Sequence, residues 1–276
     1  KNLDKHHIKN LGSKGIPKSL AKSIYTFEYN DYETLERIVE KKDIGIIKME
    51  VSRNIKPKKN FLEKIRNLST KKGIILIFDE CSSAFRKVFG GLHKFYNIEP
   101  DMAIFGKALG NGYAITAVIG KKEYMDYAEA SFISSTFWTE RIGPTAALET
   151  LKEMKRLKSW EKINNIGLKI NNHWKKLMLK HNIAADIYGL PSLTSFIINS
   201  KNWLKYKTFI TQEMLKKGIL ATNSVYVCTE HSSDIIERYI FELDKIFRII
   251  SDCEIGRNID DLLEGPICLS GLPRMN

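Results

Sequence analysis

The residue of this sequence best suited to covalent chemistry is a lysine that follows an apolar run. Lys107 comes after residues 102–105 and Gly106, and Gly110 and Gly112 follow it. An ammonium group is costly to bury unless it is paired or reacts, and glycines leave space beside the amine. Lys107 therefore suits Schiff-base chemistry with an aldehyde. The alternative is an ordinary exposed loop lysine, and the pattern Gly-x-x-x-x-Gly-Lys-Ser/Thr of a phosphate loop does not occur.

A carboxylate precedes this lysine by about one strand–helix–strand unit. Residues 73–79 form an almost uninterrupted apolar run that ends in Asp79 and Glu80. An acid at the end of a buried strand can cap a helix, bind a metal ion or pair with a protonated heterocycle, and alone it would be structural or metal-binding. Because ligands bind at the carboxyl ends of parallel strands, Asp79 and Lys107 can reach one site from neighbouring strand ends.

The first half of the chain contains the elements that would position these two residues. Short β-type runs alternate with a helical pattern, and the last strand candidates follow one another closely. In chain order the segments are strand 44–50, helix 61–68, strand 73–79, strand 102–105 and strand 114–119. The run 73–79 is typical of a parallel strand covered on both faces. The order predicts an α/β domain with a mainly parallel sheet and right-handed crossovers.

The second half has a different pattern. A helical periodicity begins at Gly143 and continues to about Lys180, and an interdomain hinge is expected along it. The remainder predicts a smaller α+β unit, with strand 193–198, helix 203–217 closed by Gly218, a β segment 219–227 and an amphipathic helix 233–250. We therefore expect a large domain over residues 1–152 and a small domain over residues 153–276.

Composition limits the class of protein. The 276 residues carry 44 Lys+Arg and 32 Asp+Glu, a net charge of +12, with 43% hydrophobic residues, which indicates a globular protein. The excess of positive charge comes mostly from lysines dispersed along the chain, so a solvated lysine-rich surface is favoured over a nucleic-acid-binding surface. No apolar run approaches the roughly 20 residues of a membrane span, and the four scattered cysteines indicate neither disulfides nor a metal site. We expect a cytoplasmic protein without a membrane or nucleic-acid partner.

Several stretches, in order along almost the whole chain, resemble the class III pyridoxal-phosphate aminotransferases. They are residues 76–81, 84–86, 99–102 and 105–112, with support from 135–141 and 221–227. The likeness is greatest to the glutamate-1-semialdehyde 2,1-aminomutase branch and its relatives in surface-polysaccharide pathways. The resemblance implies the fold type I, aspartate-aminotransferase-like architecture, with pyridoxal 5'-phosphate (PLP) as cofactor. It also implies that the chain holds part of the large domain plus the C-terminal small domain.

The resemblance implies roles for four residues. Lys107 would hold PLP as a Schiff base and then move the substrate proton. Asp79 would pair with the pyridine nitrogen and keep it protonated, which makes the ring an electron sink. Cys81 stands where the family has a small residue against the ring, and we expect it to pack there. Thr136 matches a hydroxyl that reaches the phosphate of the neighbouring subunit's cofactor, which implies a homodimer with a shared active site, although a locally satisfied turn threonine is the alternative.

The remaining candidates are expected to be structural. Glu50 and Arg86 lie in family-like stretches and are interpreted as ion-pair members before substrate contacts. His231, beside Glu230, is interpreted as a satisfied histidine and not a base.

Departures from the family pattern leave two functions open. The phosphate-cradling loop and the ring-stacking aromatic residue of the family normally precede the region that begins here, so the chain looks N-terminally truncated. The main hypothesis is PLP-dependent amino-group transfer between a small-molecule amino donor and acceptor, as an aminotransferase or an aminomutase. The segment 221–227 lacks an arginine, which favours the aminomutase-like or sugar-type branch. The alternative is a non-catalytic remnant or subunit of the same fold that needs a separate N-terminal part.

Overall fold

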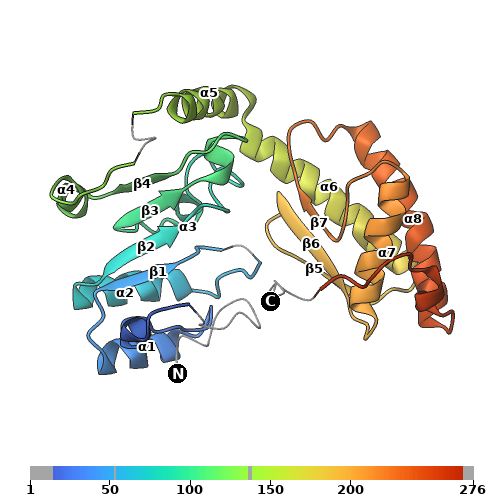
Figure 1. Ribbon diagram of the computed structural model, residues 1–276, viewed down its shortest axis with the longest axis horizontal. Helices are drawn as coiled ribbons and strands as arrows, with labels where there is room; N and C mark the ends of the chain where they lie inside the picture. Colours follow the sequence, from blue (N-terminus) through green and yellow to red (C-terminus); the bar gives the residue numbers. More distant parts are fainter. Residues whose placement is uncertain (1–14, 53, 136–138, 270–276) are drawn as a thin grey trace.

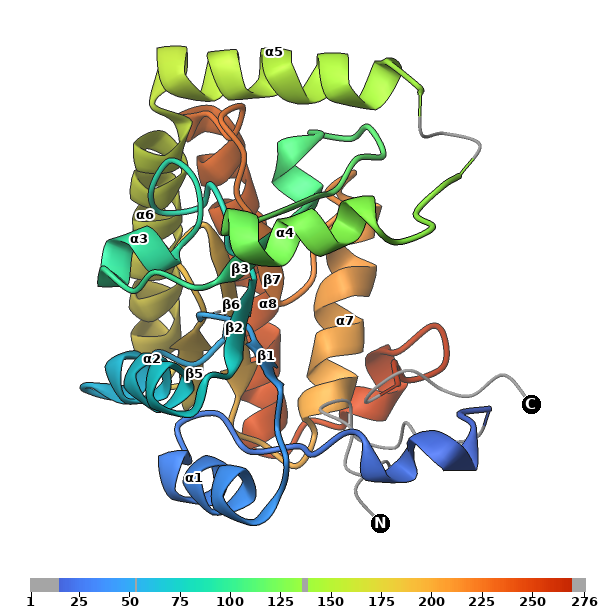
Figure 2. The same cartoon turned by 90° about the vertical axis from the view of Figure 1, so that its left-hand side faces the viewer.

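The computed structural model describes residues 15–52, 54–135 and 139–269. Two sheets stand side by side, each with its own helices, and α5 and α6 connect them (Figure 1). Viewed at 90°, α5 lies across the top of the molecule, while α6 runs down its left-hand side (Figure 2).

The first sheet has four strands in the order β1-β2-β3-β4. β1 (Ile46–Met49), β2 (Ile75–Asp79) and β3 (Met102–Phe105) are parallel, whereas β4 (Ala117–Gly120) pairs with β3 in the antiparallel sense. The expected α/β class and mainly parallel sheet are therefore confirmed. The fourth strand starts three residues later than the predicted strand 114–119, because the tight turns of the glycine-rich segment continue to residue 113.

Helix α2 packs against one face of this sheet. Inward-facing residues of the strands, including Leu76 and Phe78, pack with Phe61, Leu62 and Ile65 of α2. The helices of this half are α1 (Tyr32–Lys41), α2 (Phe61–Lys72), α3 (His93–Tyr96) and α4 (Lys122–Glu129), with 3-10 turns η2 (Lys18–Lys22) and η3 (Lys107–Leu109).

The opposite face of the sheet is more open. Burial alternates along β2, where Leu76 and Phe78 are fully buried and Ile75 and Ile77 are half-buried. Ile46 on β1 is 56% exposed. The expectation that residues 73–79 form a strand covered on both faces is thus wrong for the described part of the chain, because α2 packs against one face only.

The second half contains two long helices and an antiparallel sheet. α5 (Ile142–Leu157) and α6 (Ser159–Lys180) are separate, since Lys158 between them has the left-handed value φ 46° and breaks the periodicity predicted to continue to Lys180. β5 (Ala185–Tyr188), β6 (Leu193–Ile198) and β7 (Ser224–Tyr226) form the sheet. α7 (Trp203–Lys216), α8 (Ser233–Glu254) and the 3-10 turn η4 (Ile259–Leu262) complete the half.

A second hydrophobic core lies between this sheet and its helices. Trp174, Phe196 and Phe247 are fully buried, with Phe196 in edge contact with both other rings. The Trp174 indole donates a hydrogen bond of 3.0 Å to the Tyr239 hydroxyl, so its buried N–H is satisfied. This core is built almost entirely from the α6–α8 half.

The turn before β6 joins the two halves. Leu190 and Leu193 belong to the hydrophobic core of the first sheet, although Leu193 is the first residue of β6. Gly167 on α6 passes so close to this turn that a Cβ atom would lie 1.9 Å from the Pro191 carbonyl oxygen. The close approach requires glycine and fixes α6 against the turn. Among the helices within the described ranges, none is long and apolar enough to cross a lipid bilayer.

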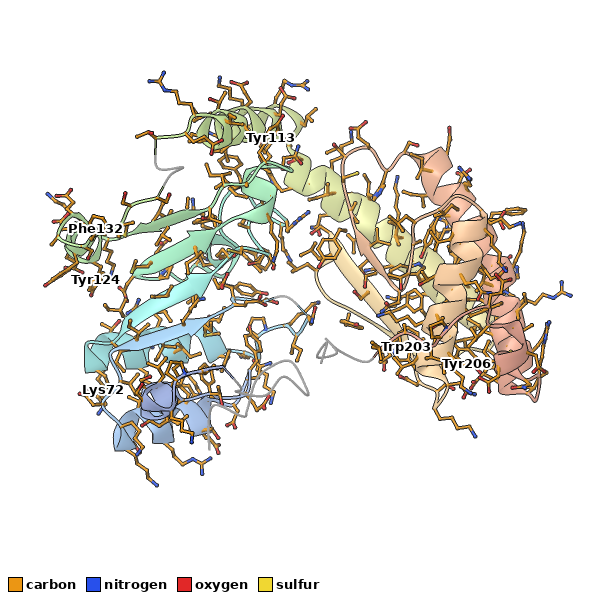
Figure 3. All side chains as sticks on the ribbon, viewed as in Figure 1. Lys72, Tyr113, Tyr124, Phe132, Trp203 and Tyr206 are labelled. Carbon is orange, nitrogen blue, oxygen red and sulfur yellow. The ribbon has the colours of Figure 1, made fainter. Side chains whose placement is uncertain are left out.

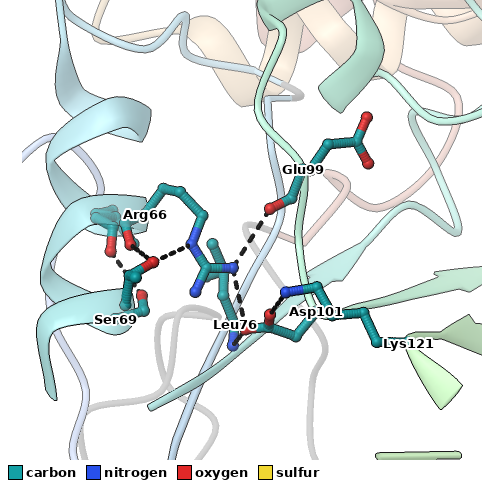
Figure 4. Close-up of polar contacts among 8 residues, drawn as sticks. Arg66, Ser69, Leu76, Glu99, Asp101 and Lys121 are labelled. Carbon is teal, nitrogen blue, oxygen red and sulfur yellow. Dashed lines mark hydrogen bonds and ion pairs between the residues drawn. The ribbon is translucent and has the colours of Figure 1, made fainter. Parts of the chain in front are cut away.

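One buried acid links the elements at the amino end of β3 (Figure 4). The Asp101 carboxylate pairs with Arg66 of α2 at 3.0 Å and with Lys121 at 2.6 Å, and it accepts the Leu76 N–H at 2.8 Å. Burial alone would raise the pKa of Asp101. The hydrogen bonds from Leu76, Lys121 and Arg66 outweigh it, so the pKa lies below its usual value.

We expect Asp101→Asn to lower the free energy of unfolding by about 3 kcal/mol at pH 7, because the variant leaves two cations and a buried N–H poorly paired. Urea denaturation measures the change, and Asp126→Asn at an exposed position is the matched control. Since the folded pKa is depressed, this stabilisation is full above about pH 4, the unfolded value. It is lost as the pH falls through the folded pKa. Equal losses in the two variants would contradict this role of Asp101.

Candidate active site

Lys107 occupies the first position of η3, with Gly106 between it and the end of β3. Its backbone is left-handed, with φ 45°, and its side chain is exposed apart from a hydrogen bond that Nζ donates to Ser82 Oγ. A Cβ atom on Gly106 would lie 3.4 Å from both Cys81 Sγ and Thr116 Cγ2. Gly106 thus packs beside Cys81 and Thr116, next to Lys107.

Asp79 lies at the end of β2, on the strand next to the one that leads to Lys107. It is in register with Ile104 across the parallel pair. Asp79 Oδ2 is 3.2 Å from Nζ of Lys48, and Oδ1 accepts the backbone N–H of Cys81 at 3.2 Å. Burial alone would raise the pKa of Asp79. The Cys81 N–H and the Lys48 ammonium outweigh it, so its pKa is lowered and the carboxylate is ionised at neutral pH.

Cys81 lies between these two residues. Burial is the main cause that raises the pKa of its thiol, the Asp79 charge adds to this effect, and the Lys107 ammonium opposes it. The thiol is therefore neutral at pH 7. The structure thus brings Asp79, Cys81 and Lys107 together at the carboxyl edge of the first sheet.

The same edge contains a buried polar network that was not among the predicted site residues. The Glu80 side chain is fully buried, and its Oε1 accepts both the N–H and Nδ1 of His93 at 2.9 Å. Its Oε2 accepts the hydroxyl of Ser83. The consecutive polar residues after β2 were a usable signal for Ser82 and Ser83. His93 is 13 positions from Glu80, and no local pattern relates them.

The chain from Glu80 to His93 folds back on itself around this network. Phe85 is left-handed at φ 63°, and its N–H donates to the Gly90 carbonyl oxygen at 2.8 Å. A Cβ atom on Gly91 would lie 2.3 Å from the His93 ring, so this position accepts only glycine. The loop is therefore a fixed support for Ser82 and its contact with Lys107.

The other predicted residues have different outcomes. Thr136 lies outside the described residues. Glu50 follows β1 directly, two strands from Lys107. The expectation that Arg86 is an ion-pair member is wrong for the described part of the chain, where no carboxylate pairs with it and its Nε has no hydrogen-bond partner. His231 Nδ1 accepts the Cys228 N–H at 3.4 Å, and burial lowers its pKa.

The donor set at the edge of the first sheet does not suit a metal ion. Among the described residues, no group of three His, Cys, Asp or Glu side chains is arranged to hold one. The combination of an accessible amine and a nearby ionised carboxylate suits a ligand that carries an electrophilic carbonyl and a protonated nitrogen.

Comparison with known proteins gives a consistent result. The profile of the family described as Aminotransferase class-III matches residues 53–252. The 3-aminobutyryl-CoA aminotransferase of Cloacimonas acidaminovorans is 35% identical over 234 residues, which cover 80% of this chain and 56% of that protein. A glutamate-1-semialdehyde 2,1-aminomutase of Methanococcus maripaludis is 30% identical over 255 residues, covering 84% of this chain and 60% of that protein.

Solved structures share the fold. The PLP form of the FumI protein of Sphingopyxis sp. MTA144 superposes with a TM-score of 0.78 at 20% identity, covering 85% of this chain and 59% of that one. The chain thus spans about 56 to 60% of the length of these relatives.

We expect Glu80→Ala to lower the free energy of unfolding by about 3 kcal/mol, because the two His93 groups and the Ser83 hydroxyl would remain buried without an acceptor. Chemical denaturation at pH 7 measures the loss. Glu99→Ala, an exposed carboxylate on the same segment, is the matched control and should change stability by less than about 0.5 kcal/mol. A Glu80 variant as stable as the control would show that the network does not hold the loop.

Proposed function

Because the chain belongs to the class-III aminotransferase family, we propose that it carries out PLP-dependent amino-group transfer through a Schiff base on Lys107. The observation that carries the proposal is the juxtaposition of Lys107 and the ionised Asp79 at the carboxyl edge of the first sheet. The substrates would be a small-molecule amino donor and an aldehyde or keto acceptor. Both an aminotransferase and an aminomutase outcome agree with the relatives' names.

The residues at this edge fit pyridoxal 5'-phosphate. Lys107 offers an exposed amine for the aldehyde, and Asp79 offers a carboxylate whose lowered pKa keeps it charged opposite a pyridinium nitrogen. Cys81 presents a neutral thiol, which behaves as a small apolar group against a ring. When bound, PLP supplies an electron sink for a carbanion.

Lys107, Asp79 and Lys48 would each have a different role in the reaction. Lys107 Nζ binds the cofactor and, once free, takes a proton from the substrate carbon and returns it to another atom. Asp79 holds the proton on the ring nitrogen. Lys48, 3.2 Å from Asp79, stabilises the ionised carboxylate.

We further propose a homodimer that pairs through β4, α4 and α5. Large apolar side chains are exposed on these elements, with Val118 at 47%, Tyr127 at 75% and Leu148 at 60%. Figure 3 shows Tyr113 beside α5 and Phe132, which is 99% exposed, beside α4. Exposed apolar side chains gathered on adjoining elements are typical of an interface.

A hollow at the start of α5 adds to this support. Its volume is about 420 Å³, and it is lined by Tyr113, Arg141, Ile142, Thr145, Ala146 and Glu149. It adjoins the turn that begins at Lys107, since α5 contacts η3. The proposed assembly would therefore place the partner near the active site, where Thr136 would act across the interface.

Two further assignments belong to the proposal. Residues 1–152 would form the PLP-binding portion, and residues 153–276 would form the small domain, so that the border lies inside α5. The two separate hydrophobic cores support this division. A cytoplasmic location agrees with the four cysteines, all of which are free.

We expect the purified chain to show an absorption band with added PLP that borohydride bleaches, and peptide mapping to find the reduced adduct on Lys107. Lys107→Ala should lose both signals, because the amine is gone, whereas the exposed-lysine control Lys122→Ala should keep them. Asp79→Asn should keep the adduct and slow amino transfer. An adduct spread evenly over surface lysines, unchanged in Lys107→Ala, would refute the assignment and favour the non-catalytic alternative.

The dimer has its own test. Leu148→Glu should weaken association at least tenfold, because it places a charge on the apolar surface of α5, and sedimentation velocity over a concentration series measures the shift. Leu179→Glu at the end of α6, where the side chain is 82% exposed, is the matched control and should leave association unchanged. A monomer at every concentration of the unmodified chain would contradict the proposed pairing.

A further inference from the structure

Ser82 is the hydrogen-bond partner of the candidate reactive amine. Nζ of Lys107 donates to Ser82 Oγ. Other lysines, among them Lys121, Lys205 and Lys245, donate to a carboxylate instead. A carboxylate only accepts hydrogen bonds, so it favours the charged ammonium over the neutral amine. Because Schiff-base chemistry uses the neutral amine, a hydroxyl is the more suitable partner for Lys107.

The hydroxyl of a serine can bind both forms of an amine. In the structure Ser82 Oγ accepts a hydrogen bond from Lys107 Nζ, which is the arrangement that an ammonium requires. After rotation about its C–O bond, the same hydroxyl can donate to the lone pair of the neutral amine. Ser82 is therefore able to keep Nζ at one position both before and after the amine gives up a proton.

Ser82 is itself held in place by its neighbours in the chain. Its exposed fraction is 7%. The preceding residue, Cys81, donates its N–H to the Asp79 carboxylate at 3.2 Å. The following residue, Ser83, donates its hydroxyl to the fully buried Glu80 side chain. The position of the Ser82 hydroxyl is thus fixed by contacts that do not involve Lys107.

The backbone of Lys107 is fixed as well. Its left-handed value of φ 45° is uncommon for a residue with a Cβ atom, and such a conformation persists where surrounding contacts enforce it. The Lys107 carbonyl oxygen accepts the N–H groups of Gly110 at 3.2 Å and Asn111 at 3.3 Å. A Cβ atom on Gly110 would lie 2.1 Å from the Tyr113 carbonyl oxygen, so the turn is tight. The remaining freedom of Lys107 lies in its flexible stem, which Ser82 restrains at the far end.

We propose that Ser82 is a positioning residue whose hydroxyl holds Lys107 Nζ in place both as an ammonium and as a neutral amine. A reactive group that is held in position reacts faster than one that samples many rotamers. The hydroxyl should therefore speed the reaction of Lys107 with an aldehyde. The contact rests on Ser82 and Lys107 alone, whereas its use in amino-group transfer rests on the proposed function.

The first test needs no cofactor. NMR of the chain with isotope-labelled lysine measures how fast each ammonium group exchanges its protons with water, and the Lys107 signal is identified by its loss in Lys107→Ala. We expect this exchange to be about fivefold faster in Ser82→Ala, because a hydrogen bond is lost, and to stay slow in Ser82→Thr, which keeps a hydroxyl. The signal of Lys122, an exposed lysine on α4, is the internal control and should not change.

The adjacent serine separates positioning from a structural effect. Ser83→Ala should lower the urea midpoint, because the buried Glu80 carboxylate loses a donor, and it should leave the exchange of the Lys107 ammonium unchanged. Two outcomes would overturn the proposal. Unchanged exchange in Ser82→Ala would show that the hydroxyl does not hold the amine. Equal acceleration in Ser82→Ala and Ser83→Ala would show that the intact loop, and not the Ser82 hydroxyl, restrains Lys107.

The second test measures the rate at which PLP forms the borohydride-reducible adduct on Lys107. We expect Ser82→Ala to form it about fivefold more slowly and Ser82→Thr to restore most of the rate. A faster reaction in Ser82→Ala would mean that the hydroxyl only stabilises the unreactive ammonium, and the proposal would be wrong. If the unmodified chain forms no adduct on Lys107, the proposed function fails, while the exchange measurement still decides whether Ser82 holds the amine.

Discussion

The parallel pairing of β2 with β3 is the constraint on which the candidate site depends. In a parallel pair both strands end at the same edge, so Asp79 at the end of β2 and Lys107 after β3 are brought to one place. Twenty-seven intervening positions connect them through a crossover that carries α3 and the Glu80–His93 loop. Had the strands been antiparallel, the two side chains would lie at opposite edges of the sheet.

Two buried carboxylates fix the two ends of this strand pair. Asp101, at the amino end of β3, forms ion pairs with Arg66 and Lys121 and accepts the Leu76 N–H. Glu80, at the carboxyl end of β2, accepts hydrogen bonds from the Ser83 hydroxyl and from the backbone N–H and ring nitrogen of His93. Most of these partners are distant in sequence, such as Arg66 from Asp101 and His93 from Glu80, so the geometry at each end depends on elements that meet only in the folded domain. The Glu80 network also fixes the start of the loop that contains Ser82 and Arg86.

Each sheet packs with helices around a hydrophobic core of its own. The first sheet has one well-packed face and one open face, and the β4–α4–α5 surface exposes apolar side chains. The second sheet packs with its helices around Trp174 and Phe196. The candidate site lies at the carboxyl edge of the first sheet, and the second half contributes Ser192, whose hydroxyl donates to the Arg86 carbonyl oxygen at 2.9 Å.

The sequence by itself determined the elements whose signal is local. Strands 102–105 and 193–198 were predicted at their observed bounds, because apolar side chains at fixed spacing record which face is buried. The order of Asp79 and Lys107 along the chain was enough to predict their proximity. Only the tertiary structure decided the antiparallel direction of β4, the break at Lys158, the pairing of Glu80 with His93 and the unpaired state of Arg86. Each of these depends on which distant groups meet in space, and a local pattern of residue types does not contain that information.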